Sequence, residues 1–71
     1  MKITYDEQAD ALYIQFQPDS GIKETIQIRD GIFCDIDKEG RMFGMEILEA
    51  SQRIPLQELG KVSIDIPIRA A

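Results

Sequence analysis

The sequence contains no histidine and a single cysteine, Cys34. Without histidine the chain cannot build a Ser-His or Cys-His nucleophile, an imidazole general base or a histidine metal ligand. One cysteine forms neither an intramolecular disulfide nor a thiolate metal cluster within one chain. Cys34 occupies an apolar, in-phase strand position, where a thiol acts as a small hydrophobic side chain. We therefore expect a protein that is not an enzyme and holds no cofactor.

Positive charge is also scarce, because eight Lys and Arg stand against thirteen Asp and Glu and leave a net charge of -5. The basic residues are scattered along the chain, so the surface is unsuited to nucleic acid, although it suits a basic protein partner. No apolar run approaches the roughly 18 residues that span a bilayer. The N-terminus lacks the apolar core of a signal peptide. We expect a cytoplasmic protein that neither enters the membrane nor is secreted.

The 71 residues are expected to form one small β-rich domain, since 44% are hydrophobic and 30% are charged, a composition typical of globular proteins. A domain of this size buries only about 60% of its unfolded surface. Any catalytic cleft would have to be shallow or shared between subunits.

Apolar residues alternate with polar ones along much of the chain, which is the pattern of half-buried strands. Asp30-Gly31 lies between two alternating segments and predicts a hairpin with a type I′ turn. A second turn is predicted over residues 37–40, with Gly40 at positive φ. The strands predicted before, between and after these turns cover residues 2–5, 11–16, 22–29, 32–36 and 43–47.

The period changes after Leu48. Residues 49–53 are compatible with a helix, which is short or broken at Ile54, because Pro55 begins a second short turn that Gly60 ends. Residues 61–68 alternate again and predict a final strand, in which Pro67 favours a sheet edge. The fold class is therefore mainly β (small α+β): an antiparallel β-meander of four to six strands with one short C-terminal helical segment. Residues 61–71 would lie at an edge or between subunits.

The segment from Asp35 to Glu46 nearly matches a calcium-binding EF-hand loop, with carboxylates at loop positions 1, 3, 5 and 12 and glycine at 6. Its flanks have the period of strands rather than helices, so we interpret it as a hairpin tip without specific calcium affinity. Asp35 and Asp37 are expected to project from the same face of one strand, about 7 Å apart. Two alternatives stay open: a small-molecule or metal-binding protein that uses Asp35, Asp37 and Glu46, and an enzyme whose site forms between subunits.

Three separated segments occur in the order found in one family of small bacterial and archaeal proteins. They are Tyr5-Asp6-x-x-Ala9-Asp10-Ala11-Leu12-Tyr13-Ile14, then Gly31-Ile32 leading to Asp35-x-Asp37-x-x-Gly40, then Gly44-Met45-Glu46-Ile47-Leu48-Glu49-Ala50-Ser51. From residue 1 to residue 54 the chain thus resembles the family catalogued as domain of unknown function 2283 (DUF2283). The resemblance implies a compact β-rich fold and no established activity. Some relatives are encoded beside small ribonuclease-toxin-like proteins, which implies an antitoxin-like or partner-masking role.

Apolar side chains are predicted on both faces of the sheet. Tyr13, Phe33, Met42 and Leu48 fall out of phase with the main apolar face of their strands. One short helix cannot cover two faces, and exposed apolar patches on a small protein usually mark an interface. We therefore predict a homo-oligomer, as a dimer, that serves as a protein-interaction module and has a basic protein as a possible further partner.

Overall fold

Five antiparallel strands form one sheet in the computed structural model, which describes residues 1–18 and 21–67. The mainly β fold predicted from the alternation is confirmed. The elements are β1 (Lys2–Asp6), β2 (Ala11–Gln15), β3 (Glu24–Arg29), β4 (Ile32–Ile36), β5 (Met42–Leu48), the short helix α1 (Ala50–Arg53) and the 3-10 helix η1 (Leu56–Lys61).

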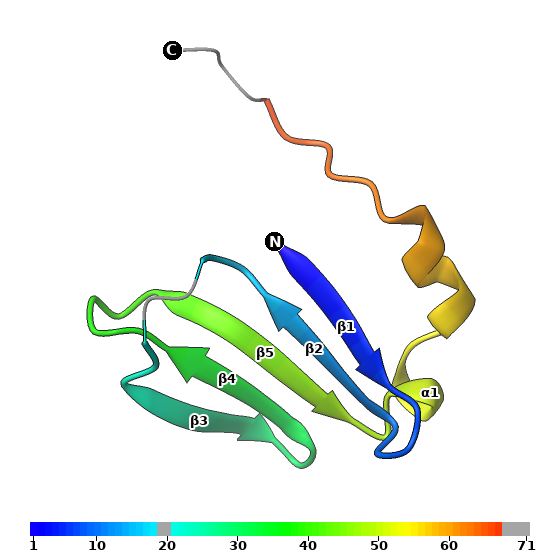
Figure 1. The fold of residues 1–71 in the computed structure, drawn as a ribbon, viewed down its shortest axis with the longest axis horizontal. Helices are drawn as coiled ribbons and strands as arrows, with labels where there is room; N and C mark the ends of the chain where they lie inside the picture. Colours follow the sequence, from blue (N-terminus) through cyan, green and yellow to red (C-terminus); the bar gives the residue numbers. More distant parts are fainter. Residues whose placement is uncertain (19–20, 68–71) are drawn as a thin grey trace.

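The strands lie side by side in the order β1-β2-β5-β4-β3 (Figure 1). β3, β4 and β5 form the predicted meander, whereas β1 and β2 form a separate hairpin whose second strand pairs with β5. This pairing places Leu12 opposite Ile47 and Ile14 opposite Met45, so apolar side chains meet across the centre of the sheet. As a result, β1 and β3 are the two edge strands.

The core lies on one face of the sheet, under α1 and η1. Its fully buried members are Leu12 and Ala50, each with 0% of its surface exposed. Around them pack half-buried residues from the sheet and both helices: Ile3, Ile14, Met45, Ile54, Leu56 and Leu59. η1 lies beside β1, at the edge of the sheet opposite to β3 (Figure 1). All six residues of β3 are exposed.

The glycines of both predicted turns take positive φ, 78° at Gly31 and 81° at Gly40. The predicted type I′ turn at Asp30-Gly31 is wrong, however, because that turn needs positive φ at both central residues and Asp30 does not have it. The register between β3 and β4 shifts between Gln27 and Arg29. Such an extra residue in one strand increases the local twist, which accommodates a turn of another type.

Gly40→Val is expected to lower the free energy of unfolding by about 1–3 kcal/mol, the usual cost of a strained backbone position. A Cβ at Gly40 would meet no atom within 4 Å, so the cost comes from the φ of 81° alone. Gly40→Asn is the matched control, because asparagine tolerates this conformation. Urea unfolding followed by circular dichroism measures both; equal midpoints for the two variants would contradict the prediction.

The C-terminal part contains the predicted helical segment but not the final strand predicted after it. α1 ends at Arg53 and Ile54 is extended, so the helix is broken where Pro55 follows. The final strand predicted from residue 61 is not formed over residues 62–67, which we call the C-terminal arm, because no neighbouring strand lies beside them to supply hydrogen bonds. The arm instead leaves the sheet (Figure 1). Residues 68–71 lie outside the described part, and strand pairing of the arm between subunits stays a prediction.

Candidate interaction surface

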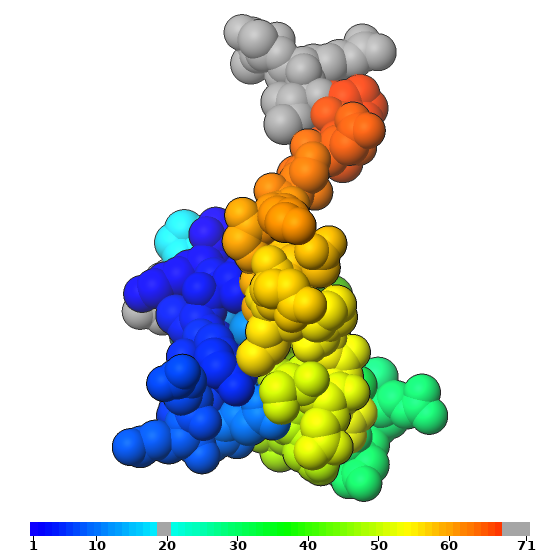
Figure 2. Space-filling view, turned by 90° about the vertical axis from the view of Figure 1, so that its right-hand side faces the viewer, coloured from blue at the N-terminus to red at the C-terminus, as the bar shows by residue number. Residues whose placement is uncertain are grey.

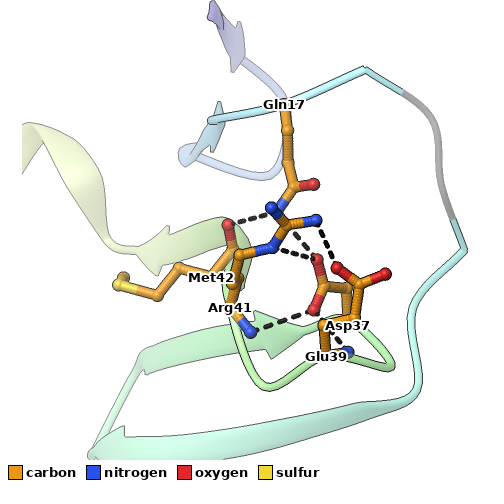
Figure 3. Close-up of polar contacts among 5 residues, drawn as sticks. All are labelled: Gln17, Asp37, Glu39, Arg41 and Met42. Atoms are coloured by element: carbon orange, nitrogen blue, oxygen red, sulfur yellow. Dashed lines mark hydrogen bonds and ion pairs between the residues drawn. The ribbon is translucent and has the colours of Figure 1, made fainter.

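Asp37 is the buried anchor of the β4–β5 turn (Figure 3), with 4% of its surface exposed. Its Oδ1 accepts hydrogen bonds from the main-chain N–H groups of Glu39 and Arg41, both at 2.9 Å. Its Oδ2 accepts one from the side-chain amide of Gln17 at 3.1 Å and lies 3.5 Å from Nε of Arg41. Both oxygens are thus occupied by groups of the turn and by Gln17, which leaves little capacity for a cation.

Asp37 should make the stability of the protein sensitive to acid. The N–H of Arg41, followed by the other donors, holds the pKa of the Asp37 carboxyl below its ordinary value of 3.8. A carboxyl with a lowered folded-state pKa stabilises the fold above its unfolded-state pKa, and this contribution disappears as the pH falls through the folded-state pKa. Between about pH 5 and pH 2, the urea midpoint should therefore fall more for the wild type than for Asp37→Asn.

The control for this measurement is Glu7→Gln, since Glu7 is exposed in the turn between β1 and β2. This variant should keep the pH dependence of the wild type. If Asp37→Asn lost stability on acidification as steeply as both other proteins, the turn carboxylate would not be the group responsible.

Asp35 lies on the sheet face opposite to the core, where it joins three strands. Its Oδ2 accepts a hydrogen bond from the hydroxyl of Tyr13 at 2.6 Å, and its Oδ1 accepts one from the hydroxyl of Thr25, also at 2.6 Å. Tyr13 reaches Asp35 across β5 at Gly44, where an added Cβ would collide with the tyrosine ring and hydroxyl. Burial, followed by the bond to Asp35, raises the pKa of Tyr13, so its hydroxyl stays a donor at neutral pH.

Glu46 lies on this same face, opposite Tyr13 on β2 and Phe33 on β4. Beside it is a hollow of about 310 Å³ whose lining includes Glu46, Asp6 and Tyr13. We call it the β1–β2–β5 hollow, lined by Thr4, Tyr5, Asp6, Ala9, Ala11, Leu12, Tyr13, Glu46 and Leu48. Its combination of small apolar residues and carboxylates suits a long side chain that ends in a positive charge.

The structure therefore does not bring Asp35, Asp37 and Glu46 together. Asp37 lies beyond the end of β4 and serves the turn, while Asp35 and Glu46 share the open sheet face. Within residues 1–18 and 21–67, no three histidine, cysteine or acidic side chains form a group that could hold a metal ion. The metal-binding alternative thus lacks its three-carboxylate ligand set in this part of the chain.

Cys34 is buried, with 5% of its surface exposed, on the core side of the sheet. Burial, followed by the charge of Asp35, raises the pKa of the thiol. A buried thiol with a raised pKa is a poor nucleophile, which agrees with the hydrophobic role predicted for this position.

Asp10 organises contacts that the sequence alone did not predict. It adopts the left-handed conformation at φ 50°, and its carboxylate accepts hydrogen bonds from the hydroxyls of Tyr5 and Ser51, each at 2.7 Å, and from the N–H of Ser51 at 3.0 Å. Its main-chain carbonyl accepts a further bond from the N–H of Ala50. The β1–β2 turn is thereby tied to the start of α1, across 41 residues of sequence.

Residues 2–51 match the model of a family described as a protein of unknown function, DUF2283. The chain belongs to the DUF2283 family. No curated protein and no solved structure matches it. The matched part of this DUF2283 member holds the whole sheet, the Asp10–Ser51 contacts and the Tyr13–Asp35 bond, whereas η1 and the C-terminal arm follow it. In the described part of the chain, no helix has the length and apolar character needed to cross a bilayer.

Proposed function

We propose that this protein is a non-enzymatic protein-interaction module of the cytoplasm that binds, first of all, a second copy of itself. The observation that supports this proposal is the exposure of aliphatic side chains over the half of the sheet that α1 and η1 leave open. Ile26 and Ile28 on β3 are 45% and 53% exposed, and Ile22 just before it is 50% exposed. Contiguous exposed apolar surface on a small protein usually serves an interface.

The small size of the core also supports self-association. The buried hydrophobic residues in the described part of the chain are Leu12, Cys34, Phe43, Ile47 and Ala50. Domains of this size gain stability from disulfides, metals or oligomerisation, and a chain with one cysteine cannot form an intramolecular disulfide. Association of two copies would bury the open apolar half of the sheet.

Light scattering coupled to size exclusion tests the proposal at micromolar concentration. The expected result is a particle of twice the chain mass of 8.1 kDa. Its mass should persist in about 1 M salt, which screens surface charges strongly but does not weaken apolar burial. A folded monomer at low and high salt would contradict the proposal.

A second candidate function is the masking of a basic protein partner, in the manner of an antitoxin. The observation that favours it is the β1–β2–β5 hollow, whose carboxylates, Glu46 and Asp6, border the apolar side chains of Ala11 and Leu48. The stem of a partner's lysine or arginine would lie on the apolar residues, with its positive charge near Glu46. The net charge of -5 would also favour the approach of a basic partner.

A short lysine-rich peptide serves as the probe for this second function. On titration, amide NMR shifts should move at Tyr13, Glu46 and Leu48, and Glu46→Lys should abolish them. Glu58→Lys is the matched control, because it makes the same charge change on η1, at a residue that does not line the hollow. Equal loss of the shifts in both variants would indicate general charge attraction rather than a site in the hollow.

A further inference from the structure

The C-terminal arm has the side-chain pattern of a strand but no strand partner. Val62, Ile64 and Ile66 alternate with polar residues, and they are 53%, 59% and 60% exposed. The arm stands clear of the folded part of the protein (Figure 2). An extended, alternating apolar segment in water gains stability when its backbone groups and apolar side chains meet a sheet edge.

β3, together with the residues just before it, offers an edge of matching pattern. Its exposed isoleucines lie on an edge strand, whereas the other edge strand, β1, has Ile3 packed into the core and η1 beside it. The β3 edge therefore leaves more apolar surface for a visiting strand than the β1 edge does.

The arm of a chain cannot pair along its own β3. It begins beside β1, and β3 lies four strand positions away, about 19 Å at about 4.8 Å per strand. Six extended residues span about 20 Å, so the arm would be used up in crossing the sheet. An arm that occupies β3 must therefore come from a second copy.

We propose that the C-terminal arm of one copy adds to the edge of β3 in a second copy as a sixth, antiparallel strand. The inference rests on the proposed self-association. One antiparallel register fits the side chains: it sets Asp65 opposite Lys23, Ser63 opposite Thr25 and Val62 opposite Ile26. The same register sets Ile66 opposite Ile22 and Ile64 opposite Glu24, so the arm covers the first half of β3 and the two residues before it. Opposite charges, hydroxyl pairs and β-branched pairs are each favourable across strands.

Reciprocal exchange of two arms closes a two-fold symmetric dimer, in which each copy donates one arm and receives one. It also covers the first half of each open β3 edge, and open edges otherwise invite further association. The dimer is thus finite, and the arm determines which edge is used.

Disulfide trapping between two differently tagged batches tests the pairing. Both carry Cys34→Ala; one carries Ser63→Cys in the arm, and the other carries Thr25→Cys on β3. Directly opposite residues in antiparallel strands have Cα atoms about 4.5–5.5 Å apart, which permits a disulfide. Mild oxidation of the mixture should give a heterodimer on a non-reducing gel. The matched control replaces Thr25→Cys by Thr4→Cys, which puts the thiol on the other edge strand, β1.

The outcomes separate this inference from the proposed function. Trapping at Thr25 but not at Thr4 supports it, whereas trapping at Thr4, or at neither position in a protein that stays dimeric, overturns it and leaves self-association standing. A monomeric wild type overturns both.

In the wild-type background, joint replacement of Val62, Ile64 and Ile66 by serine should weaken the dimer roughly 100-fold or more, since three aliphatic side chains lose their burial. An unchanged dimer in that variant also overturns the inference.

Discussion

Leu12→Ala is expected to lower the free energy of unfolding by about 2–5 kcal/mol, the usual cost of deleting a fully buried leucine side chain. Leu12 has no exposed surface, and it lies opposite Ile47 at the centre of the sheet. Sheet and helices meet at this position, because Ala50 of α1 belongs to the same buried cluster. The loss is comparable to the whole stability of many small domains, so the variant should be largely unfolded near physiological temperature.

Chemical denaturation at fixed protein concentration measures this effect, because self-association would make the midpoint depend on concentration. Leu12→Met is the matched control, since it nearly conserves volume and should cost less than about 1.5 kcal/mol. If Leu12→Ala were no more destabilising than Leu12→Met, the core would be centred elsewhere.

The strands and turn glycines could be predicted from the sequence because their causes are local. Alternation at period two follows from the pleat of a strand, and it located β2, β3, β4 and β5 to within a few residues, although it also predicted a strand that residues 62–67 do not form. Gly40 was predicted at positive φ because a turn had to lie between two alternating segments. The type of the turn at Asp30 was not predictable in this way, because it depends on the register shift between β3 and β4.

The order of the strands could not be predicted, because it depends on contacts between residues far apart in the sequence. β2 pairs with β5 rather than with its neighbour β3, and alternation is the same for either partner. The hydrogen bonds from Ser51 to Asp10 were missed for the same reason. The β2–β5 pairing and the Ser51–Asp10 hydrogen bonds both lie within the segments that carry the family resemblance.

The arrangement of the three carboxylates could not be predicted from the sequence. Asp35 and Glu46 share one sheet face, whereas Asp37, which was expected on the face of Asp35, holds the β4–β5 turn. A short polar side chain in a turn can bond its own backbone two to four residues ahead, and this local bonding competes with any ligand. The EF-hand spacing contains the same acids and glycine as such a turn, so the spacing alone does not distinguish the two.

Gly44→Val is expected to cost about 3 kcal/mol or more, the upper range for forcing extra atoms into occupied space. A Cβ at this position would collide with the ring and hydroxyl of Tyr13 and would lie 2.9 Å from the carbonyl oxygen of Ile14. Displacing Tyr13 would also break its hydrogen bond to Asp35, which links β2 to β4 across β5. Gly60→Val is the matched control, because a Cβ there meets no atom within 4 Å.

A double-mutant cycle with Tyr13→Ala separates the collision with the tyrosine from the collision with the backbone. If the tyrosine is the main obstacle, Gly44→Val should cost less in the Tyr13→Ala background than in the wild type, by about 1–3 kcal/mol of coupling. The residual cost measures the contact with Ile14, whose carbonyl cannot move without disturbing the β2–β5 ladder. Strict additivity of the two substitutions would show that Tyr13 does not lie over Gly44, and the bridge from Tyr13 to Asp35 would then have to be abandoned as a feature of the open face.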